Sequence, residues 1–547
     1  MAIIANMAQS FGVEEAMSRR GLVFDLAVIF ASVALFCFLS LYQLNLPGLY
    51  YDEAADAVPA MQITLGQEVE LFNQSGIWLG DRAFPVMVMD YVGAVNTYAL
   101  LPFFALFGVD VLSLRLMTVT VGVLVIILSY LFTKELFNRG VAAITVLLLA
   151  VHPSFVFWSR QGIYVTSVMG VMAMGSLLAL LKWHKSGKGI YFYIGCFLLG
   201  LGLSAKILFV WFIIALGVMY ALLRLLGNVR RFTLKQFALG LLVFGAGAWM
   251  ILLYNIEKQG TIAVISKNLV TSQYGVSNLD FLQNLSARLQ NFRVLLEGGH
   301  FWYLGGLFSN RLYPYVLLAA LASVFVFLLV RRAAKSDRLK IGFIVGLIAL
   351  VLVQSCFTIS GLWPTHLLIL LPLSQMVIAI SVSLLRRLAP FGKAALLLGA
   401  VAVTALFIRD LQVDLQYHRA LRETRGWSHH SDAIYRLASF LDGQEEAEPI
   451  AMDWGIKTSV QILTQGRVSP VEIFQYSQEP NSTFFDWLYG NLMNPNCLYI
   501  FHAEESTVFP RYKAFEEFSH KFEKKVNLEQ TIAQHDGKAV YLIYSSR

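Results

Sequence analysis

Three carboxyl groups lie within one short segment of the sequence, YYDEAAD at positions 50–56. Asp52 and Asp56 are four residues apart, so on a helix they lie on the same face. Neighbouring acids raise each other's pKa, and a carboxylate with a pKa near neutrality can take a proton from a hydroxyl group. The segment therefore predicts Asp52 and Glu53 as catalytic acids or bases, with Asp56 binding substrate. Another interpretation stays open, because acids are common at helix starts and the segment could simply begin an amphipathic helix on the membrane.

Histidine and aromatic residues form a second group of candidates. His300, Trp302 and Tyr303 lie between two glycine pairs and could stack on a sugar or line the path of a lipid. Aromatic residues at a membrane interface also serve as anchors, so a structural role is the alternative. His366 begins an apolar run and could contact a phosphate, although a lone histidine is often structural.

The composition indicates the kind of molecule that must position these residues. The chain has 547 residues, of which 57% are hydrophobic and 14% charged, and its mean hydropathy is +0.62. A soluble domain has roughly 25% charged residues. These values exclude a disordered chain, a nucleic-acid-binding protein and an ordinary cytosolic enzyme, and they indicate a polytopic α-helical membrane protein.

Apolar runs long enough to cross a bilayer predict about eleven transmembrane helices. The runs lie at 22–44, 112–134, 140–157, 163–182, 189–206, 207–226, 236–256, 312–330, 341–360, 366–385 and 394–409. The segment Ala83–Gly108 is also apolar but contains Asp90, Asn96 and Pro102. We expect it to form a juxtamembrane or re-entrant helix packed against protein.

Positive charge then sets the orientation, because cytoplasmic loops collect Lys and Arg. With eleven spans the short basic loops all fall on one side. They contain Arg19, Arg20, Lys134, Arg139, Lys182, Lys185, Lys188, Arg224, Arg230, Arg231, Lys235, Arg331, Arg332, Lys335, Arg338, Lys340, Arg386, Arg387 and Lys393. This pattern predicts a cytoplasmic N-terminus and an extracytoplasmic C-terminal domain.

Two domains are expected, a transmembrane domain over 1–409 and a soluble α/β domain over 410–547. The second has 13 basic and 19 acidic residues, and short strand patterns over 450–454, 468–474 and 497–501 precede a hairpin at Asp536-Gly537. Long outer loops over 45–111 and 257–311 interrupt the first domain. Loops of this length between spans usually carry function.

Several segments together resemble the GT-C membrane glycosyltransferases, in particular the protein mannosyltransferases and aminoarabinose transferases. An apolar first helix is followed by Asp-Glu and an amphipathic helix. Residues 106–160 are similar to a family segment that runs from Phe-Gly through two spans to Ser-Arg, and GLGLSAK at 200–206 and PTHLLILLPLSQ at 364–375 resemble later pieces. The likeness extends loosely over residues 22–385.

The resemblance implies an inverting transfer of a hexosyl or pentosyl group from a polyprenyl-phosphate donor to an acceptor at the outer face of the membrane. Asp52, with Glu53 beside it, matches the family's acid and would deprotonate the acceptor hydroxyl. The leaving phosphate needs cations. The candidates on the outer face are Lys206, Arg160, Arg82 and Arg311.

One departure from the family bears on metal binding. Many relatives have a second acid shortly after Ser-Arg, whereas residues 159–166, SRQGIYVT, contain none. A divalent cation is therefore an open question, and Asp56 or another acid of the first loop could supply the missing charge. No other cofactor is expected.

Two other functions stay open. The chain could be an inactive accessory subunit that binds partner subunits through its C-terminal domain, or a transporter of lipid-linked sugars. A transporter usually has charged residues near the bilayer centre, which these spans nearly lack. The expected partners are membrane lipid, the polyprenyl-phosphate donor and a protein, lipid or glycan acceptor, and the expected location is a bacterial cytoplasmic membrane.

Overall fold

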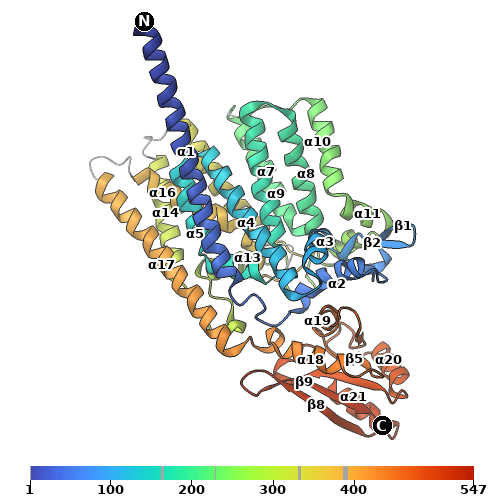
Figure 1. Cartoon of the computed structure of the whole chain (residues 1–547). Helices are drawn as coiled ribbons and strands as arrows, with labels where there is room; N and C mark the ends of the chain where they lie inside the picture. The colour runs from blue at the N-terminus through green and yellow to red at the C-terminus, as the bar shows by residue number, and fades with distance from the viewer. Residues whose placement is uncertain (1, 162–165, 228, 330–333, 386–391, 547) are drawn as a thin grey trace.

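The computed structural model has a helical body with a smaller mixed α/β unit at one end (Figure 1). It describes residues 2–161, 166–227, 229–329, 334–385 and 392–546. Arg331, Arg332, Arg386 and Arg387, which contribute to the predicted orientation, lie outside these residues. The N-terminus and this C-terminal α/β unit, called the tail below, lie at opposite ends of the body (Figure 1).

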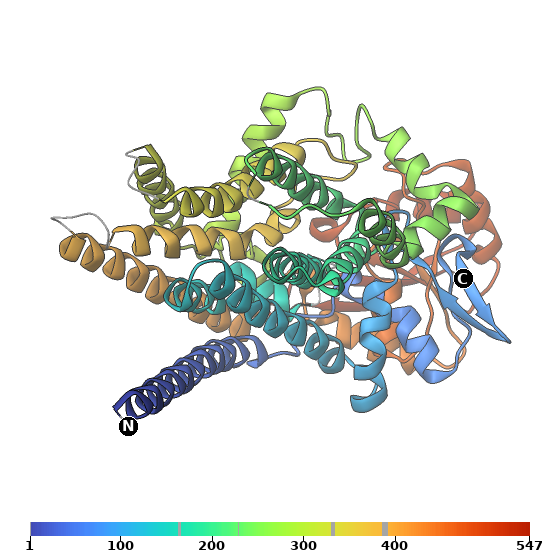
Figure 2. The same cartoon turned by 90° about the horizontal axis from the view of Figure 1, so that it is seen from above.

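Helices form at the predicted spans because long apolar runs can satisfy their backbone groups only internally. They are α1 (Ala2–Leu41), α4 (Val111–Leu136), α5 (Arg139–Ala150), α6 (Pro153–Arg160), α7 (Thr166–Ser186), α8 (Gly189–Ala205), α9 (Val210–Leu225), α10 (Leu234–Gly247), α11 (Trp249–Lys258), α14 (Leu312–Leu329), α15 (Lys335–Gln354), α16 (Leu371–Leu385) and α17 (Gly392–Thr424). Seen from above, these helices lie side by side (Figure 2).

Among the described residues, six helices are long and apolar enough to cross a membrane. The number rises to eight if each of two bent pairs counts as one span, α5 with α6 at 60° and α10 with α11 at 73°. Helices α7, α8 and α15 cover the remaining predicted runs but are not among these candidate spans. The count of eleven therefore stays a prediction.

The segment predicted to be the first outer loop begins with α2 (Tyr51–Leu65) and ends with α3 (Val95–Phe107). Between them two small antiparallel hairpins form, β1 (Gly76–Leu79) with β2 (Arg82–Pro85) and β3 (Met87–Met89) with β4 (Val92–Gly93). The expectation of one helix over Ala83–Gly108 is therefore wrong for its first half. The second loop contains α12 (Gly260–Lys267), α13 (Phe281–Glu297) and the short turn η3 (Trp302–Leu304).

The tail has a five-stranded sheet of order β6-β5-β7-β9-β8. Its strands are β5 (Glu448–Ala451), β6 (Val471–Glu472), β7 (Cys497–His502), β8 (Val526–Ala533) and β9 (Ala539–Ser546). Strands β6, β5 and β7 are parallel, and β9 pairs antiparallel with β7 and β8. The helices of the tail are α18 (Ala433–Asp442), α19 (Lys457–Leu463), α20 (Ser482–Leu492) and α21 (Tyr512–Lys521).

Helix α17 continues through the predicted domain boundary at 409–410 and ends at Thr424. The described part of the tail packs on the same end of the body as α2. Gly48, between α1 and α2, shows how close this contact is, because its amide donates to the carbonyl of His430 at 2.8 Å. A Cβ atom at this position would lie 2.0 Å from the carbonyl oxygen of Ser431.

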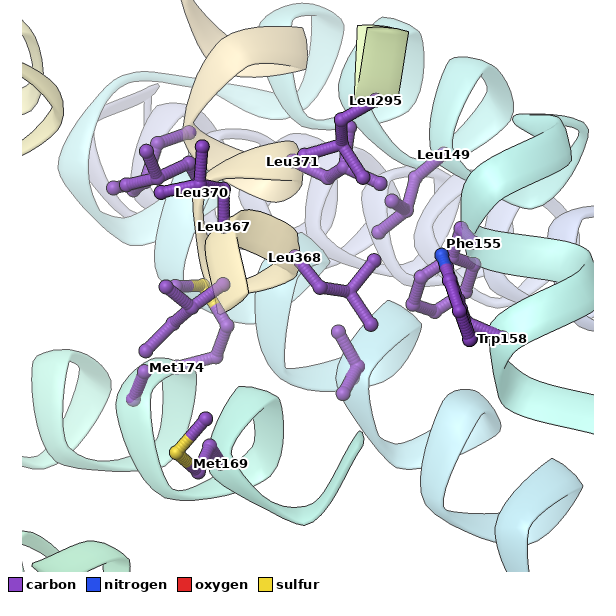
Figure 3. Close-up of a cluster of buried hydrophobic side chains, with 14 of the residues drawn as sticks. Leu149, Phe155, Trp158, Met169, Met174, Leu295, Leu367, Leu368, Leu370 and Leu371 are labelled. Atoms are coloured by element: carbon purple, nitrogen blue, oxygen red, sulfur yellow. The ribbon is translucent and has the colours of Figure 1, made fainter. Parts of the chain in front are cut away.

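The body is held together by a buried apolar cluster around the segment from η4 (Pro364–Leu370) into α16. Leu367, Leu368 and Leu371 of this segment point toward Leu149, Phe155, Met174 and Leu295 of the surrounding helices (Figure 3). Phe155 and Phe157 of α6 belong to this cluster. The same packing holds η4 against α13. His366 of η4 lies within electrostatic range of Lys206, the residue that follows α8.

Candidate active site at the start of helix α2

Helix α2 places two acids in its first turn, where the partial positive charge of a helix N-terminus favours carboxylates. Tyr50 precedes the helix in an extended conformation, and its amide lies 3.5 Å from the Glu53 carboxylate. Gly66 ends the helix at a φ of 69°, a left-handed conformation suited to glycine. The side chain of Asp52 is partly exposed, whereas those of Glu53 and Asp56 are buried.

Asp52 has the properties of a group that exchanges a proton near neutral pH. Burial raises the pKa of Asp52 to about 7, against the opposing positive charge of Lys206, and the nearby Asp56 raises it further. The mutual effect of the two acids was expected, but burial is the larger cause. Asp52 therefore combines access to a ligand with a pKa suited to a general base.

Asp56 lies one helical turn after Asp52 and accepts a hydrogen bond from the Asn96 amide at 2.8 Å. Burial raises the pKa of Asp56 to about 6, while Asn96 and Lys206 favour its charged form. Asn96 belongs to α3, so the two helices of the first outer loop meet at this acid. Asp56 shares the electrostatic environment of Asp52 but is less accessible.

Glu53 has a different environment from the one predicted. Its carboxylate is fully buried and forms an ion pair with Arg115 at 2.9 Å. Arg115 also donates to the carbonyls of Leu44 and Pro47, each at 2.9 Å. Glu53 is therefore held in a structural ion pair that fixes the connection between α1 and α2, and a catalytic role for it does not fit this environment.

Lys206 faces the two aspartates from the end of α8. Its backbone is extended, with φ −158° and ψ 134°, where α8 stops and α9 has not yet begun. Burial lowers the pKa of Lys206 to about 8, although Asp52 and Asp56 favour its charged form. Lys206 is thus a cation that lies opposite the two acids Asp52 and Asp56.

The three predicted arginines are not assembled around Asp52. Arg160 is buried, and its guanidinium donates to the carbonyls of Ser40 and Tyr42 at 3.1 and 2.6 Å. Arg82 and Arg311 are exposed, the former at the turn of the β1–β2 hairpin and the latter just before α14. Among the described residues, no hydrogen bond or ion pair joins any of them to α2.

The second outer loop contributes a stack of rings. Tyr303 is buried, donates to the Gln161 side chain at 2.5 Å and stacks on His430 of the tail at 3.8 Å. His430 in turn stacks on Tyr50 at 4.1 Å. Tyr303 thus supports the segment before Asp52. The neighbouring Trp302 is not part of this stack, and its side chain is about half exposed.

His366 is buried, whereas His300 is partly exposed. The Nε2 atom of His300 accepts from the Trp158 indole at 2.7 Å, and burial lowers the pKa of His300 to about 3, so the ring is neutral. His366 is buried in η4, where the charges of Lys206 and Arg288 act on it. Of these two histidines, only His366 lies near Lys206.

Arg288 of α13 is a candidate that the sequence analysis missed. It is fully buried, its Nε donates to the Ser355 carbonyl at 2.7 Å, and its guanidinium lies over the Trp211 ring at 5.4 Å. Its two terminal nitrogens have no hydrogen-bond partner among the described residues. The sequence does contain a signal, because Asn284, Arg288 and Phe292 repeat every four residues along the buried face of α13.

Few side chains near Asp52 could act as ligands of a metal ion. In the part of the chain that the structure describes, no group of three or more His, Cys, Asp or Glu side chains is arranged to hold a metal ion. Residues 162–165, which belong to the stretch without a second acid, lie outside that part.

Comparisons with known proteins agree with this architecture. Residues 94–254 match the family described as dolichyl-phosphate-mannose-protein mannosyltransferase. No curated protein matches the chain in sequence.

The solved structures that are similar in fold include a transferase and an oligosaccharyltransferase. ArnT from Cupriavidus metallidurans, bound to undecaprenyl phosphate, has a TM-score of 0.57 at 12% identity, and the match covers 96% of this chain and 98% of ArnT. The oligosaccharyltransferase AglB from Archaeoglobus fulgidus, in complex with an inhibitory peptide and a dolichol-phosphate, has a TM-score of 0.53 at 17% identity, covering 90% of this chain and 71% of AglB. The resemblance predicted from the sequence is therefore confirmed, and the chain is a GT-C-like membrane protein with the fold of these glycosyltransferases.

Proposed function

We propose that the protein is an inverting glycosyltransferase that moves a sugar from a polyprenyl-phosphate donor to an acceptor at the outer face of a bacterial cytoplasmic membrane. The observation that carries the proposal is the pairing of a partly accessible acid, Asp52, with the buried cation Lys206 in a GT-C fold. Both ArnT and AglB have been solved with a polyprenyl-type phosphate bound.

In the proposed reaction Asp52 acts as the general base. Its carboxylate takes the proton of the acceptor hydroxyl as the acceptor oxygen attacks the anomeric carbon of the donor. The bond between that carbon and the phosphate oxygen breaks, and the phosphate leaves with the electron pair. Because attack comes from the side opposite the leaving group, the anomeric configuration inverts.

The leaving phosphate needs cationic donors that are already in place, since preorganised charge stabilises the transition state most strongly. Lys206 and Arg288 fit this role. Lys206 is protonated at neutral pH, and both terminal nitrogens of Arg288 are free of partners among the described residues. His366 lies in the electrostatic range of both and adds a polar group beside them.

The proposed location follows the charge pattern of the sequence. The N-terminus lies in the cytoplasm, while α2 and the C-terminal domain face the outside. Their position at one end of the body, opposite the N-terminus, agrees with this arrangement (Figure 1).

An accessory subunit is the second candidate, and the burial of Glu53 in an ion pair favours it, because only one of the two predicted catalytic acids is then available. In that case the protein would have this fold but no catalytic activity, and the C-terminal domain would bind partner subunits. The two functions differ in whether Asp52 matters for sugar transfer.

Donor binding can be tested with undecaprenyl phosphate as the probe. The protein in nanodiscs is titrated with this lipid, and binding is followed by native mass spectrometry. We expect Lys206→Ala and Arg288→Ala each to weaken binding, by roughly tenfold for each lost charge-assisted contact. Arg82→Ala is the matched control and should bind as the wild type does. Wild-type protein that does not bind the lipid, or equal binding by all variants, overturns the proposed phosphate site.

A further inference from the structure

The edge of the tail sheet lies against the first turn of α2. Strand β6 is the edge strand, and Glu472 is its last residue. Tyr476 follows shortly after, with its hydroxyl 3.4 Å from that of Tyr51, and Thr458 donates to the Tyr51 carbonyl at 3.2 Å. The tail therefore reaches the residue directly before Asp52.

Glu472 has a carboxylate available for a ligand. One of its oxygens is buried and has no hydrogen-bond partner among the described residues. Burial raises the pKa of Glu472 to about 7, partly offset by Lys457 and by a hydrogen bond from Tyr51. This group can therefore donate or accept a hydrogen bond near neutral pH.

Tyrosines surround Asp52 on the same side. Tyr476 comes from the tail and Tyr274 from the second outer loop. Their side chains are 68% and 54% exposed, respectively. The charge of Asp52 and the hydroxyl of Tyr274 both act electrostatically on Tyr476. The ring of Tyr476 rests against Phe509 at 5.8 Å, which supports it from within the tail.

The charges of this region disfavour an anionic ligand. Asp52 and Glu472 are both acidic, and the cation that acts on Glu472, Lys457, is ion-paired with Glu70 at 2.8 Å. Tyrosine rings with their hydroxyls, together with a carboxyl group, suit a ligand with apolar C–H faces and many hydroxyl groups. Sugars have this chemistry, because their C–H faces pack on rings and their hydroxyls bond to carboxylates.

We propose that the tail completes the acceptor site, where Tyr476 and Glu472, with Tyr51 and Tyr274, bind an uncharged carbohydrate acceptor beside Asp52. This inference rests on the proposed function and narrows its acceptor to a glycan. Tyr476 and Glu472 are binding residues, and Asp52 performs the proton transfer.

The test uses the full chain in nanodiscs and a panel of methyl glycosides of glucose, galactose, mannose and N-acetylglucosamine. Saturation-transfer NMR measures binding of each glycoside to the wild type, Tyr476→Ala and Glu472→Gln. We expect at least one glycoside to give a signal in the wild type, and roughly fivefold weaker binding in either variant, since a ring contact contributes about 1 kcal/mol. Tyr489→Ala, which removes another exposed tyrosine of the tail, on α20, is the matched control and should bind normally.

The outcomes separate the two proposals. If undecaprenyl phosphate binds but no glycoside does, or if Tyr489→Ala weakens binding as much as Tyr476→Ala, the acceptor inference is overturned while the donor site stands. If a serine- and threonine-containing peptide binds through Tyr476 in place of any glycoside, the acceptor is a peptide and the inference is wrong. If neither lipid nor glycoside binds, the proposed function itself fails.

Discussion

At the scale of single residues, the environment of each acid decides its role more than its sequence position does. Asp52 and Glu53 are adjacent, yet one is partly exposed near Lys206 and the other is buried against Arg115. The sequence identified the segment, with Asp52 as the predicted base, and it offered Lys206 as one of four candidate cations for the phosphate. The sequence could not distinguish the role of Asp52 from that of Glu53, because Arg115, the ion-pair partner of Glu53, lies 62 residues away along the chain.

The pKa values of Asp52 and Lys206 predict a bell-shaped pH dependence of kcat/KM. Asp52 must be deprotonated to act as a base, so activity rises as the pH passes about 7. Lys206 must be protonated to hold the phosphate, so activity falls as the pH passes about 8. A pH profile of sugar transfer measures both limbs.

Lys206→Arg tests the assignment of the alkaline limb. A guanidinium stays charged far above neutral pH, so this variant should retain activity at alkaline pH while keeping the acidic limb. An alkaline limb that does not move in Lys206→Arg means that another group causes it.

The ion pair between Glu53 and Arg115 predicts a large stability effect. Arg115→Leu leaves the Glu53 carboxylate buried without its partner, which costs roughly 3–5 kcal/mol. We expect a clearly lower unfolding temperature by scanning fluorimetry, and partial recovery when Glu53→Leu is added. A single variant as stable as the wild type would show that the pair has no structural role.

At the scale of helices and strands, apolar runs were sufficient to locate the helices of the body. The hairpins β1–β2 and β3–β4 were missed because their strands have only two to four residues. The boundary at 409–410 was set by the change in charge, but Asp410 and Asp414 are fully buried on a helix that simply continues. These two acidic residues therefore belong to the buried part of the body. Composition alone does not reveal whether an acidic residue is buried.

The close contact at Gly48 predicts how the tail is attached. Gly48→Ala puts a methyl group against the Ser431 carbonyl, and overpacking of this kind typically costs about 1–3 kcal/mol. The tail should shift away from α2, and limited proteolysis should cleave faster around residues 425–432. Gly342→Ala is the control, because a Cβ atom there meets nothing within 4 Å. Equal cleavage of both variants would contradict this account of the contact.

At the scale of the whole molecule, the proposed site draws its residues from separate parts of the chain. Asp52 comes from the first outer loop, Lys206 from the end of α8, Arg288 from the second loop and Glu472 from the tail. The fold class was predicted from composition and motif order, since both are spread along the chain. The proposed contribution of the tail to the site was not predicted, because long-range contacts between domains leave no local pattern.

The proposed orientation predicts which surfaces a membrane-impermeant maleimide reaches in intact cells. A cysteine introduced as Glu504→Cys, exposed in the tail, should be labelled. Lys188→Cys, exposed between α7 and α8 at the other end of the body, should be labelled only after the cells are opened. The wild type controls for its own four cysteines. The reverse pattern would place the site on the cytoplasmic side.

The central claim is that Asp52 is the base of a sugar transfer from a polyprenyl-phosphate donor. The most direct measurement compares the wild type with Asp52→Asn in nanodiscs, following sugar transfer from polyprenyl-phosphate sugars and, in the same samples, binding of undecaprenyl phosphate. We predict that Asp52→Asn lowers transfer by about 10²–10⁴-fold, the usual contribution of a general base, while lipid binding is unchanged. Transfer by Asp52→Asn at the wild-type rate would contradict the claim.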